Sequence, residues 1–399
     1  MVRTPADHDL YGAAGPCGRR SCGAAAITNR VCSPGLASGQ TGTLQAGVTS
    51  SYRMPAEWAP HDAVWTAWPY LAEQWSEGLD APRRALMQMC VGIVDLNEQG
   101  QPRGERVELL VKDAAAEAAA RALLGPAAVG VRFHQTTYGD IWLRDTGPLY
   151  VTRGHGATGE VSAVRFGFDG WGGKYLMPGD TGVSQFVMGV SGHRGAAFEF
   201  VLEGGAVEVD GTGAIMTTKQ CLLGGARNPG LNQAALEARL CWALGGTHVI
   251  WLDQGLINDH TDGHIDTIAR FVAPGVVACM EPKADDPNRD AMNSIIADLR
   301  RAKAANGQLI EVVTVPSPGA VLDAAGELTP ASYMNFYIAN TTVVVPVYGV
   351  AADDAAVHAI GRMFPGRRTV AADGKAVVIG GGAFHCATQQ QPRVPGVAQ

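Results

Sequence analysis

Residues 376–392 read Ala-Val-Val-Ile-Gly-Gly-Gly-Ala-Phe-His-Cys-Ala-Thr-Gln-Gln-Gln-Pro, which joins a short apolar run to three glycines and a cysteine. We expect residues 376–379 to form a buried strand, because continuous runs of small apolar residues are typical of one. The glycines that follow allow backbone conformations closed to other residues. The run therefore predicts a strand that delivers the thiol of Cys386 to the rim of a cavity.

A cysteine is reactive as its thiolate, which forms where a positive charge or a helix N-terminus lowers the thiol pKa. His385 is adjacent to Cys386 in the sequence. Consecutive residues of an extended segment point to opposite faces, so we expect the activating histidine to come from elsewhere. The alternative is a buried, inert cysteine beside a glycine turn, and this stretch alone leaves both interpretations open.

Composition narrows the class of protein. The 399 residues are 46% hydrophobic, as in an ordinary globular protein. The formal charge of −7 and the lack of any Lys/Arg block indicate no nucleic acid and no anionic membrane as partner, whereas a small cationic substrate suits them. No apolar run approaches the roughly 20 residues of a membrane span. Eight scattered cysteines without paired spacing favour reduced thiols in a cytoplasmic protein.

The chain divides near position 52. Residues 1–52 are rich in Gly, Ala, Ser and Thr without apolar periodicity, which predicts a disordered extension or a mis-assigned start. The pair Arg19-Arg20 resembles a twin-arginine export signal, but the apolar region after it is too short. We expect residues 53–399 to form a single catalytic domain. The sequence leaves the oligomeric state open, a homo-oligomer included.

Helix and strand patterns alternate along that domain, which predicts an α/β fold. Helical periodicity covers residues 82–96, 114–124, 232–244 and 291–305. Strand patterns cover residues 63–69, 107–111, 129–133, 161–168, 198–209, 214–217, 248–252, 265–272, 276–280, 309–314, 334–339, 342–346 and 369–372. Strands often arrive in pairs before a helix, unlike a doubly wound nucleotide fold. A repeated strand, strand, helix, strand module would give this rhythm.

Residues 139–148 are the first of three stretches that place polar groups inside apolar sequence. Asp145 lies where a loop enters a strand, and Trp142 offers a flat apolar wall. The alternative to a functional role is an aspartate that caps the turn before Gly147 and pairs with Arg144.

Residues 200–209 form the second stretch, where Glu203 interrupts a run typical of a buried strand. A buried carboxylate is costly unless it meets a cation or hydrogen-bond donors, so such a residue often belongs to a site. The alternative is a bulge at Gly204-Gly205 that turns Glu203 toward solvent.

Residues 258–267 form the third stretch. On a strand, His264 and Asp266 would share a face, so a base and a carboxylate would project into one cavity. A competing interpretation is a metal site, for which the candidate ligands are His260, His264, Asp259, Asp262 and Asp266. The thiol of Cys386 argues against it, because sulfur is an unusual partner for an oxygen-rich site.

Taken together, these stretches resemble the agmatine deiminase and bacterial peptidylarginine deiminase family, part of the guanidino-group-modifying superfamily. The matching motifs run in family order from about Tyr52 to Pro392 and are jointly specific. They are Tyr52-Arg53-Met54-Pro55-Ala56-Glu57-Trp58, Trp142-Leu143-Arg144-Asp145-Thr146-Gly147-Pro148, Gly170-Trp171-Gly172-Gly173-Lys174-Tyr175, Leu202-Glu203-Gly204-Gly205, Gly263-His264-Ile265-Asp266, Asn335-Phe336-Tyr337-Ile338-Ala339-Asn340 and residues 380–392.

The resemblance implies a fivefold pseudo-symmetric α/β propeller, the pentein fold, built from strand, strand, helix, strand modules. It also implies a central active site without metal or cofactor, where a guanidino group is hydrolysed to a ureido group through a covalent thiouronium on Cys386. By matched position, His264 is the general acid and base, and the surrounding carboxylates are Asp145, Asp266 and Glu203. Trp142, Trp171 and Gly382 are expected beside the substrate.

The expected substrate is agmatine, which would give N-carbamoylputrescine on the route to putrescine and polyamines, because the resemblance is closest to agmatine-acting members. One position departs from them. Many such members have an acidic residue four positions before the histidine, where this chain has His260. Peptidylarginine or free arginine is therefore the alternative substrate. From other classes, a metal-dependent hydrolase and a non-catalytic guanidine-binding protein also stay open.

Overall fold

The structure, a computed structural model, describes residues 51–397. The extension predicted for residues 1–52 therefore lies outside the described residues up to position 50. Within residues 51–397, no helix is both long enough and apolar enough to cross a membrane.

The strands of residues 51–397 form five small sheets. In sheet order they are β16 (Gln389–Pro392), β1 (His61–Ala67), β2 (Arg106–Val111) and β3 (Val131–Gln135); β4 (Leu149–Arg153), β5 (Glu160–Gly167) and β6 (Ala197–Val201); β7 (Glu208–Val209), β8 (Ala214–Thr218) and β9 (His248–Leu252); β10 (Ala269–Ala273), β11 (Val276–Glu281) and β12 (Glu311–Pro316); and β13 (Tyr337–Ile338), β14 (Thr342–Val347) and β15 (Arg368–Asp373).

Every sheet repeats one pairing pattern. In the order given above, the first strand of each sheet pairs antiparallel with the second, and the second pairs parallel with the third. A parallel pair needs a crossover, and a helix supplies it in each sheet. The crossover helices that recur once in each sheet are α1 (Asp80–Val94), α5 (Asp180–Ser191), α7 (Gln233–Leu244), α8 (Arg289–Arg301) and α9 (Asp353–Met363). The four-stranded sheet has a further parallel strand, β3, which helix α2 (Ala114–Leu124) joins to β2. The repeat is the strand, strand, helix, strand module of a pseudo-fivefold α/β propeller, as predicted.

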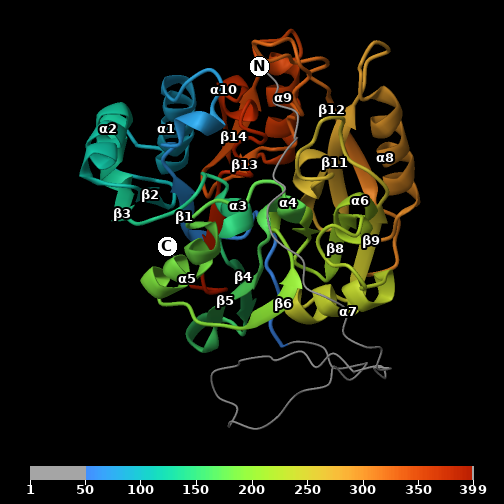
Figure 1. Cartoon of the computed structure of the whole chain (residues 1–399). Helices are drawn as coiled ribbons and strands as arrows, with labels where there is room; N and C mark the ends of the chain where they lie inside the picture. Colours follow the sequence, from blue (N-terminus) through green and yellow to red (C-terminus); the bar gives the residue numbers. More distant parts are fainter. Residues whose placement is uncertain (1–50, 398–399) are drawn as a thin grey trace, which may run out of the picture.

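The crossover helices lie on the outside of the molecule, and two short helices lie near its middle (Figure 1). The short helices are α3 (Leu143–Thr146) and α4 (Gly170–Gly173). The remaining elements are α6 (Lys219–Leu223), α10 (Lys375–Val378), and the 3-10 turns η1 (Ala72–Gln74), η2 (Gly125–Gly130), η3 (Gly156–Thr158), η4 (Gly204–Ala206) and η5 (Ile265–Thr267).

The ring is closed by the C-terminal strand. β16 pairs antiparallel with β1, which places Gln389 opposite Trp65. The first module therefore takes its first strand from the C-terminal end of the chain and the other strands from the N-terminal end. Cys386 lies three residues before β16, so closure of the ring also fixes the thiol.

The strand predicted over residues 376–379 is wrong, because Lys375–Val378 form α10. Val377 packs into the core around α1, and Val378 packs into the core around α9 and β14. A short apolar run is buried in either conformation, so periodicity cannot separate a strand from a single helical turn.

Three other predicted strands are shorter than expected. Residues 198–209 form β6 and β7 with η4 between them, residues 265–267 form η5 before β10, and residues 334–339 contain only β13. In each case the apolar run includes a segment that reaches the centre of the ring, where contacts from other modules set the backbone. The helices α5 and α9 were absent from the prediction.

Candidate active site

Each module brings polar groups to the centre from the same place, the short segment before its first strand. Asp145 lies in α3 before β4, Glu203 precedes η4 and β7, and His264 and Asp266 flank the start of η5 before β10. Asn335 precedes β13, and Cys386 precedes β16. All six side chains are at least 95% buried. The fold thus gathers at one point residues that lie as much as 241 positions apart in sequence.

Gly205 marks the point where three of these side chains meet. A Cβ atom there would lie 2.5 Å from His264 Nδ1, 3.0 Å from Asp145 Oδ1 and 3.1 Å from Asp266 Oδ2. Only glycine fits so close to three polar atoms. Its backbone N–H donates to Asp145 Oδ1 at 3.0 Å, and His264 Nδ1 lies 3.8 Å from that same oxygen.

His264 and Asp266 do converge, but not in the way the sequence predicted. His264 is the N-cap of the 3-10 turn η5 and Asp266 lies within it, so the two do not share the face of a strand. Thr261 fixes the backbone of His264, because the backbone N–H of His264 donates to Thr261 Oγ1 at 3.0 Å.

Cys386 is held by an amide and a carboxylate. Its sulfur lies 3.1 Å from Asn335 Nδ2, which donates to it, and 3.3 Å from Asp266 Oδ2. Asn335 Oδ1 accepts from the backbone N–H groups of Ala383 and Cys386, so this one side chain fixes both the loop and the thiol. Burial and the neighbouring Asp266 and Asp145 raise the thiol pKa well above its usual value.

A cavity of about 130 Å³ opens onto Cys386 and Asp145. Trp142, Trp171 and Gly382, expected beside the substrate, all line it. A Cβ atom on Gly382 would lie 2.8 Å from the Trp142 ring and 2.9 Å from Cys386 Cβ, so glycine keeps the approach to the sulfur open. Other lining residues are Gln74, Asp140, Tyr175, Met177, His260, Thr261, Ile379, Gly380 and Gly381.

The two tryptophans are oriented by carboxylates. Trp171 Nε1 donates to Asp145 Oδ2 at 2.9 Å, and Trp142 Nε1 donates to Asp140 Oδ2 at 3.0 Å. Trp171 has φ of 56°, a left-handed conformation that costs energy for a residue with a side chain. The rings form rigid apolar walls next to the acidic end of the cavity.

His264 lies behind the cavity with no exposed surface. Neither of its ring nitrogens has a hydrogen-bond partner among the described residues. Burial is the main reason that its pKa falls to about 3, although Asp266 opposes the shift. The imidazole is therefore neutral at physiological pH and able to accept a proton.

Glu203 is fully buried, so the bulge that would turn it toward solvent is wrong. Both of its oxygens accept from Arg227 Nε, at 2.7 and 3.0 Å. Burial raises the pKa of Glu203, and Arg227 opposes that rise. The proposed pairing of Arg144 with Asp145 is also wrong, because Arg144 Nη1 donates to Glu57 Oε1 at 2.9 Å.

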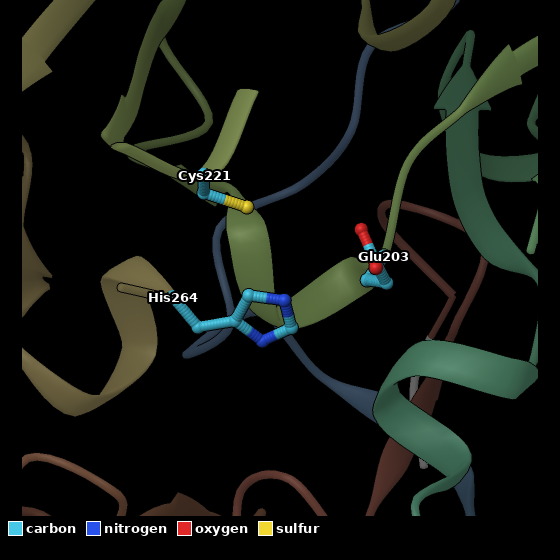
Figure 2. Close-up of side chains that lie close together, drawn as sticks. All are labelled: Glu203, Cys221 and His264. Atoms are coloured by element: carbon cyan, nitrogen blue, oxygen red, sulfur yellow. The ribbon is translucent and has the colours of Figure 1, made fainter. Parts of the chain in front are cut away.

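Glu203, Cys221 and His264 surround one small space, with a possible ligand atom from each within 4.8 Å of the others (Figure 2). Arg227 places a cation on this carboxylate, which disfavours a second cation beside it. The metal cluster considered from sequence is arranged differently, because its carboxylates are engaged elsewhere. Asp259 accepts from Thr261, whereas Asp262 pairs with Lys174 and Arg227.

Sequence reasoning missed Asn335 and Arg227 as site residues. Asn335 stands in an apolar run, where a lone buried amide is a signal comparable to that of Glu203. Arg227 contacts Glu203, Asp262 and the carbonyl of Thr261, and only the fold brings these partners together.

Comparison with known proteins gives consistent results. A sequence model of the family described as Porphyromonas-type peptidyl-arginine deiminase matches residues 53–392. The agmatine deiminase of Ectopseudomonas mendocina is 35% identical over 369 residues, covering 86% of this chain and 96% of the relative. The agmatine deiminase structure from Enterococcus faecalis is 30% identical with a TM-score of 0.78, covering 88% of this chain and 99% of that one. A Campylobacter jejuni agmatine deiminase, 21% identical, shares the fold with a TM-score of 0.73 over 86% of this chain and 97% of that one.

Proposed function

The chain belongs to the Porphyromonas-type peptidyl-arginine deiminase family, and we propose that it hydrolyses agmatine to N-carbamoylputrescine and ammonia. One observation carries the proposal. Cys386 and Asp145 line a cavity walled by tryptophans, and the buried Asp266 and neutral His264 lie 3.3 Å from the sulfur and 3.8 Å from Asp145, respectively. Relatives of similar length that are named agmatine deiminase support this substrate.

The carboxylates of Asp145 and Asp266 bind the guanidinium group. A guanidinium is a planar cation whose N–H groups match carboxylate oxygens, and fixed pairing aligns its central carbon with an attacking atom. Asp266 Oδ1 is buried and lacks a hydrogen-bond partner among the described residues, so a substrate N–H would satisfy it. Burial and the neighbouring Asp266 and Glu203 raise the pKa of Asp145, and a bound cation stabilises its ionised form.

Cys386 is the nucleophile. Two carboxylates disfavour its thiolate in the empty site, and the guanidinium neutralises them, so the substrate itself helps to ionise the thiol. His264, which is neutral, accepts the proton that Cys386 loses. The sulfur then forms a bond to the guanidinium carbon and gives a tetrahedral adduct.

His264 next acts as the acid. It protonates one amino group of the adduct, the C–N bond breaks, ammonia leaves, and a thiouronium remains on Cys386. Water then loses a proton to His264 and bonds to the same carbon. The C–S bond breaks and its electron pair returns to Cys386, while the hydroxyl group of the adduct gives its proton to the released ammonia. The proton held by His264 returns to the sulfur, and the neutral ureido product leaves.

Glu203 serves through its surroundings. Burial and Arg227 lower the pKa of His264, and the pairing of Glu203 with Arg227 places a negative charge beside that cation. Asn335 keeps Cys386 on the line of attack.

We also propose that the enzyme acts in the cytoplasm. The five cysteines within residues 51–397 are free thiols, and the nucleophile must stay reduced.

A colorimetric assay for ureido product tests the proposed function. Agmatine, arginine and a blocked peptidylarginine are supplied to the wild-type enzyme and to Cys386→Ala, with and without EDTA. We expect product from agmatine with the wild type, with or without chelator, and none with Cys386→Ala. Loss of activity in EDTA would favour metal-dependent hydrolysis, and bound guanidine without product would indicate a non-catalytic protein.

A further inference from the structure

His385 lies between two carboxylates and is completely buried. Its Nδ1 is 2.6 Å from Asp266 Oδ2, and its Nε2 is 2.8 Å from Glu57 Oε1. Two acceptors at these distances repel each other, so each contact contains a hydrogen and the ring carries a charge. Glu57 and Asp266 favour that charge, against burial, Arg144 and Arg270, which lower the pKa of His385. His385 therefore links Asp266, the aspartate next to the nucleophile, to Glu57. His385 and Glu57 are 328 positions apart in the sequence.

Glu57 is itself fixed by two buried arginines. Arg144 Nη1 donates to Oε1 at 2.9 Å, and Arg270 Nη2 donates to Oε2 at 2.5 Å. Burial alone would raise the pKa of Glu57, but Arg144, His385 and Arg270 hold it well below its usual range. The carboxylate stays ionised and provides a rigid anchor for the His385 ring.

The two oxygens of Asp266 have different environments as a result. Oδ2 contacts both His385 Nδ1 and Cys386 Sγ, whereas Oδ1 has no hydrogen-bond partner in the described part of the chain. A carboxylate free to rotate would exchange these roles. The contact with His385 prevents the exchange, because rotation would break a short hydrogen bond between two fully buried side chains.

We propose that His385 and Glu57 are positioning residues that keep Asp266 Oδ2 against the thiol and leave Oδ1 free for the guanidinium. The inference rests on the proposed function only in its kinetic test, which needs turnover of agmatine. Its binding test, which uses guanidinium, is independent of turnover. His385, the neighbour of the nucleophile, thus acts through Asp266 without touching the substrate.

The charged and titratable groups around Asp266 and His385 come from four of the five modules. They are Glu57, Arg144, Asp145, Glu208, His264, Arg270 and Cys386. Burial raises the pKa of Asp266, but His385, with smaller effects from His264 and Arg270, lowers it below its ordinary value. Loss of His385 should therefore raise the pKa of Asp266, and the acid limb of kcat/KM should move to higher pH.

The test compares His385→Gln with His134→Gln. His134 is the matched control, because its Nε2 also lies 2.6 Å from a glutamate, Glu108, but on the strand β3 away from the cavity. We expect His385→Gln to lower kcat/KM for agmatine by about 10- to 100-fold, mainly through a higher KM, the size typical for loss of an orienting partner. The acid limb should shift in this variant alone.

A binding measurement makes the test independent of turnover. Iodoacetamide alkylation of the Cys386 peptide is followed by mass spectrometry at increasing guanidinium chloride, below denaturing concentrations. We expect half-protection of His385→Gln to need at least tenfold more guanidinium than the wild type needs. If the wild type is protected but makes no ureido product, the proposed function fails and the positioning role is still measured.

Glu57→Asp provides a second variant in case His385→Gln does not fold. It keeps the charge that the arginines need but shortens the reach to His385, and it should show the same changes to a smaller degree. The proposal is overturned if the folded variants lose thermal stability as His134→Gln does but keep the KM, the pH profile and the guanidinium protection of the wild type.

Discussion

The sulfur of Cys386 lies 3.3 Å from Asp266 Oδ2, so the nucleophile rests against a carboxylate in the empty site. This contact, with burial and the nearby Asp145, raises the thiol pKa well above its ordinary value. The enzyme therefore keeps its cysteine protonated until a cation arrives. Such a site protects the thiol from unwanted electrophiles and couples its activation to the right substrate.

Removal of the charge on Asp266 should increase the fraction of Cys386 that is ionised to the thiolate. In Asp266→Asn the pKa of Cys386 falls, so we expect alkylation by iodoacetamide near neutral pH to speed up about tenfold for each unit of pKa. The rate is measured on the Cys386 peptide by mass spectrometry. Asp253→Asn, which removes a surface carboxylate paired with Lys219, should leave the rate unchanged. A slower or unaltered rate in Asp266→Asn would contradict this explanation of the resting thiol.

Burial of neutral His264 should limit stability in acid. Its pKa is about 3 in the folded protein and 6.5 as the ordinary value, so the unfolded chain binds the proton more readily. Above pH 6.5 the imidazole is neutral in both states and the difference in pKa has no effect. As the pH falls from 6.5 toward 3, the unfolded chain binds the proton and the free energy of unfolding decreases. Each unit corresponds to about 1.4 kcal/mol, so the loss reaches several kcal/mol.

His264→Asn, which lacks that titration, should lose less stability over the same pH range. Urea unfolding of both proteins at several pH values between 3 and 7 measures the difference. Parallel declines in the two proteins would mean that other groups dominate acid unfolding.

His260 at the cavity mouth should control the far end of the substrate. Its ring lies next to the Tyr175 ring, with the ring centroids 5.8 Å apart. Position 260 therefore offers an imidazole, and not a carboxylate, to the ammonium group of an incoming agmatine. His260→Glu should lower the KM for agmatine about two- to fivefold, the size of an exposed ion pair, and should not favour arginine. Steady-state kinetics on both substrates, with His260→Gln as the neutral control, provide the measurement. Equal effects on agmatine and arginine would place the distal amine elsewhere.

Gly382 should be intolerant of any side chain. A methyl group there would lie 2.8 Å from Trp142 and 2.9 Å from Cys386 Cβ, so either the ring or the nucleophile must move. Gly382→Ala should reduce kcat/KM by at least 100-fold, because small displacements of reacting groups are costly. Gly366→Ala, where a Cβ atom meets nothing within 4 Å, is the control for activity and stability. Near-normal turnover in Gly382→Ala would show that the thiol is approached from another side.

Much of the fold could be predicted because its signals are local. Antiparallel pairs and crossover helices each lie within one stretch, and α2 and β9 span the predicted residues. The segments that failed, such as 376–379 and 265–268, are apolar runs at the centre of the ring. Their backbone is set by contacts such as that of Ser332 with the carbonyl of Thr267 and that of α10 with α1, which no local pattern reveals.

The centre was partly predictable for a related reason. A charged residue within an apolar run is conspicuous, and this signal identified Asp145, Glu203 and Asp266, which the structure brings together with His264 and Cys386. Their partners were not predictable, because only the folded chain brings Arg227 to Glu203 and Glu57 to His385. His385 was set aside as the activating histidine because neighbours in an extended segment point to opposite faces, yet its ring contacts the site through Asp266.

The central claim is a covalent bond between Cys386 and the guanidino carbon, and acid quenching followed by mass spectrometry tests it most directly. Wild-type enzyme mixed with agmatine and quenched within one turnover should gain the mass of agmatine less one ammonia, located on the Cys386 peptide. His264→Asn lacks the acid that releases ammonia, so it should form much less of this adduct than the wild type in the same time. Ureido product formed without any adduct, or formed equally well by Cys386→Ala, would contradict the account.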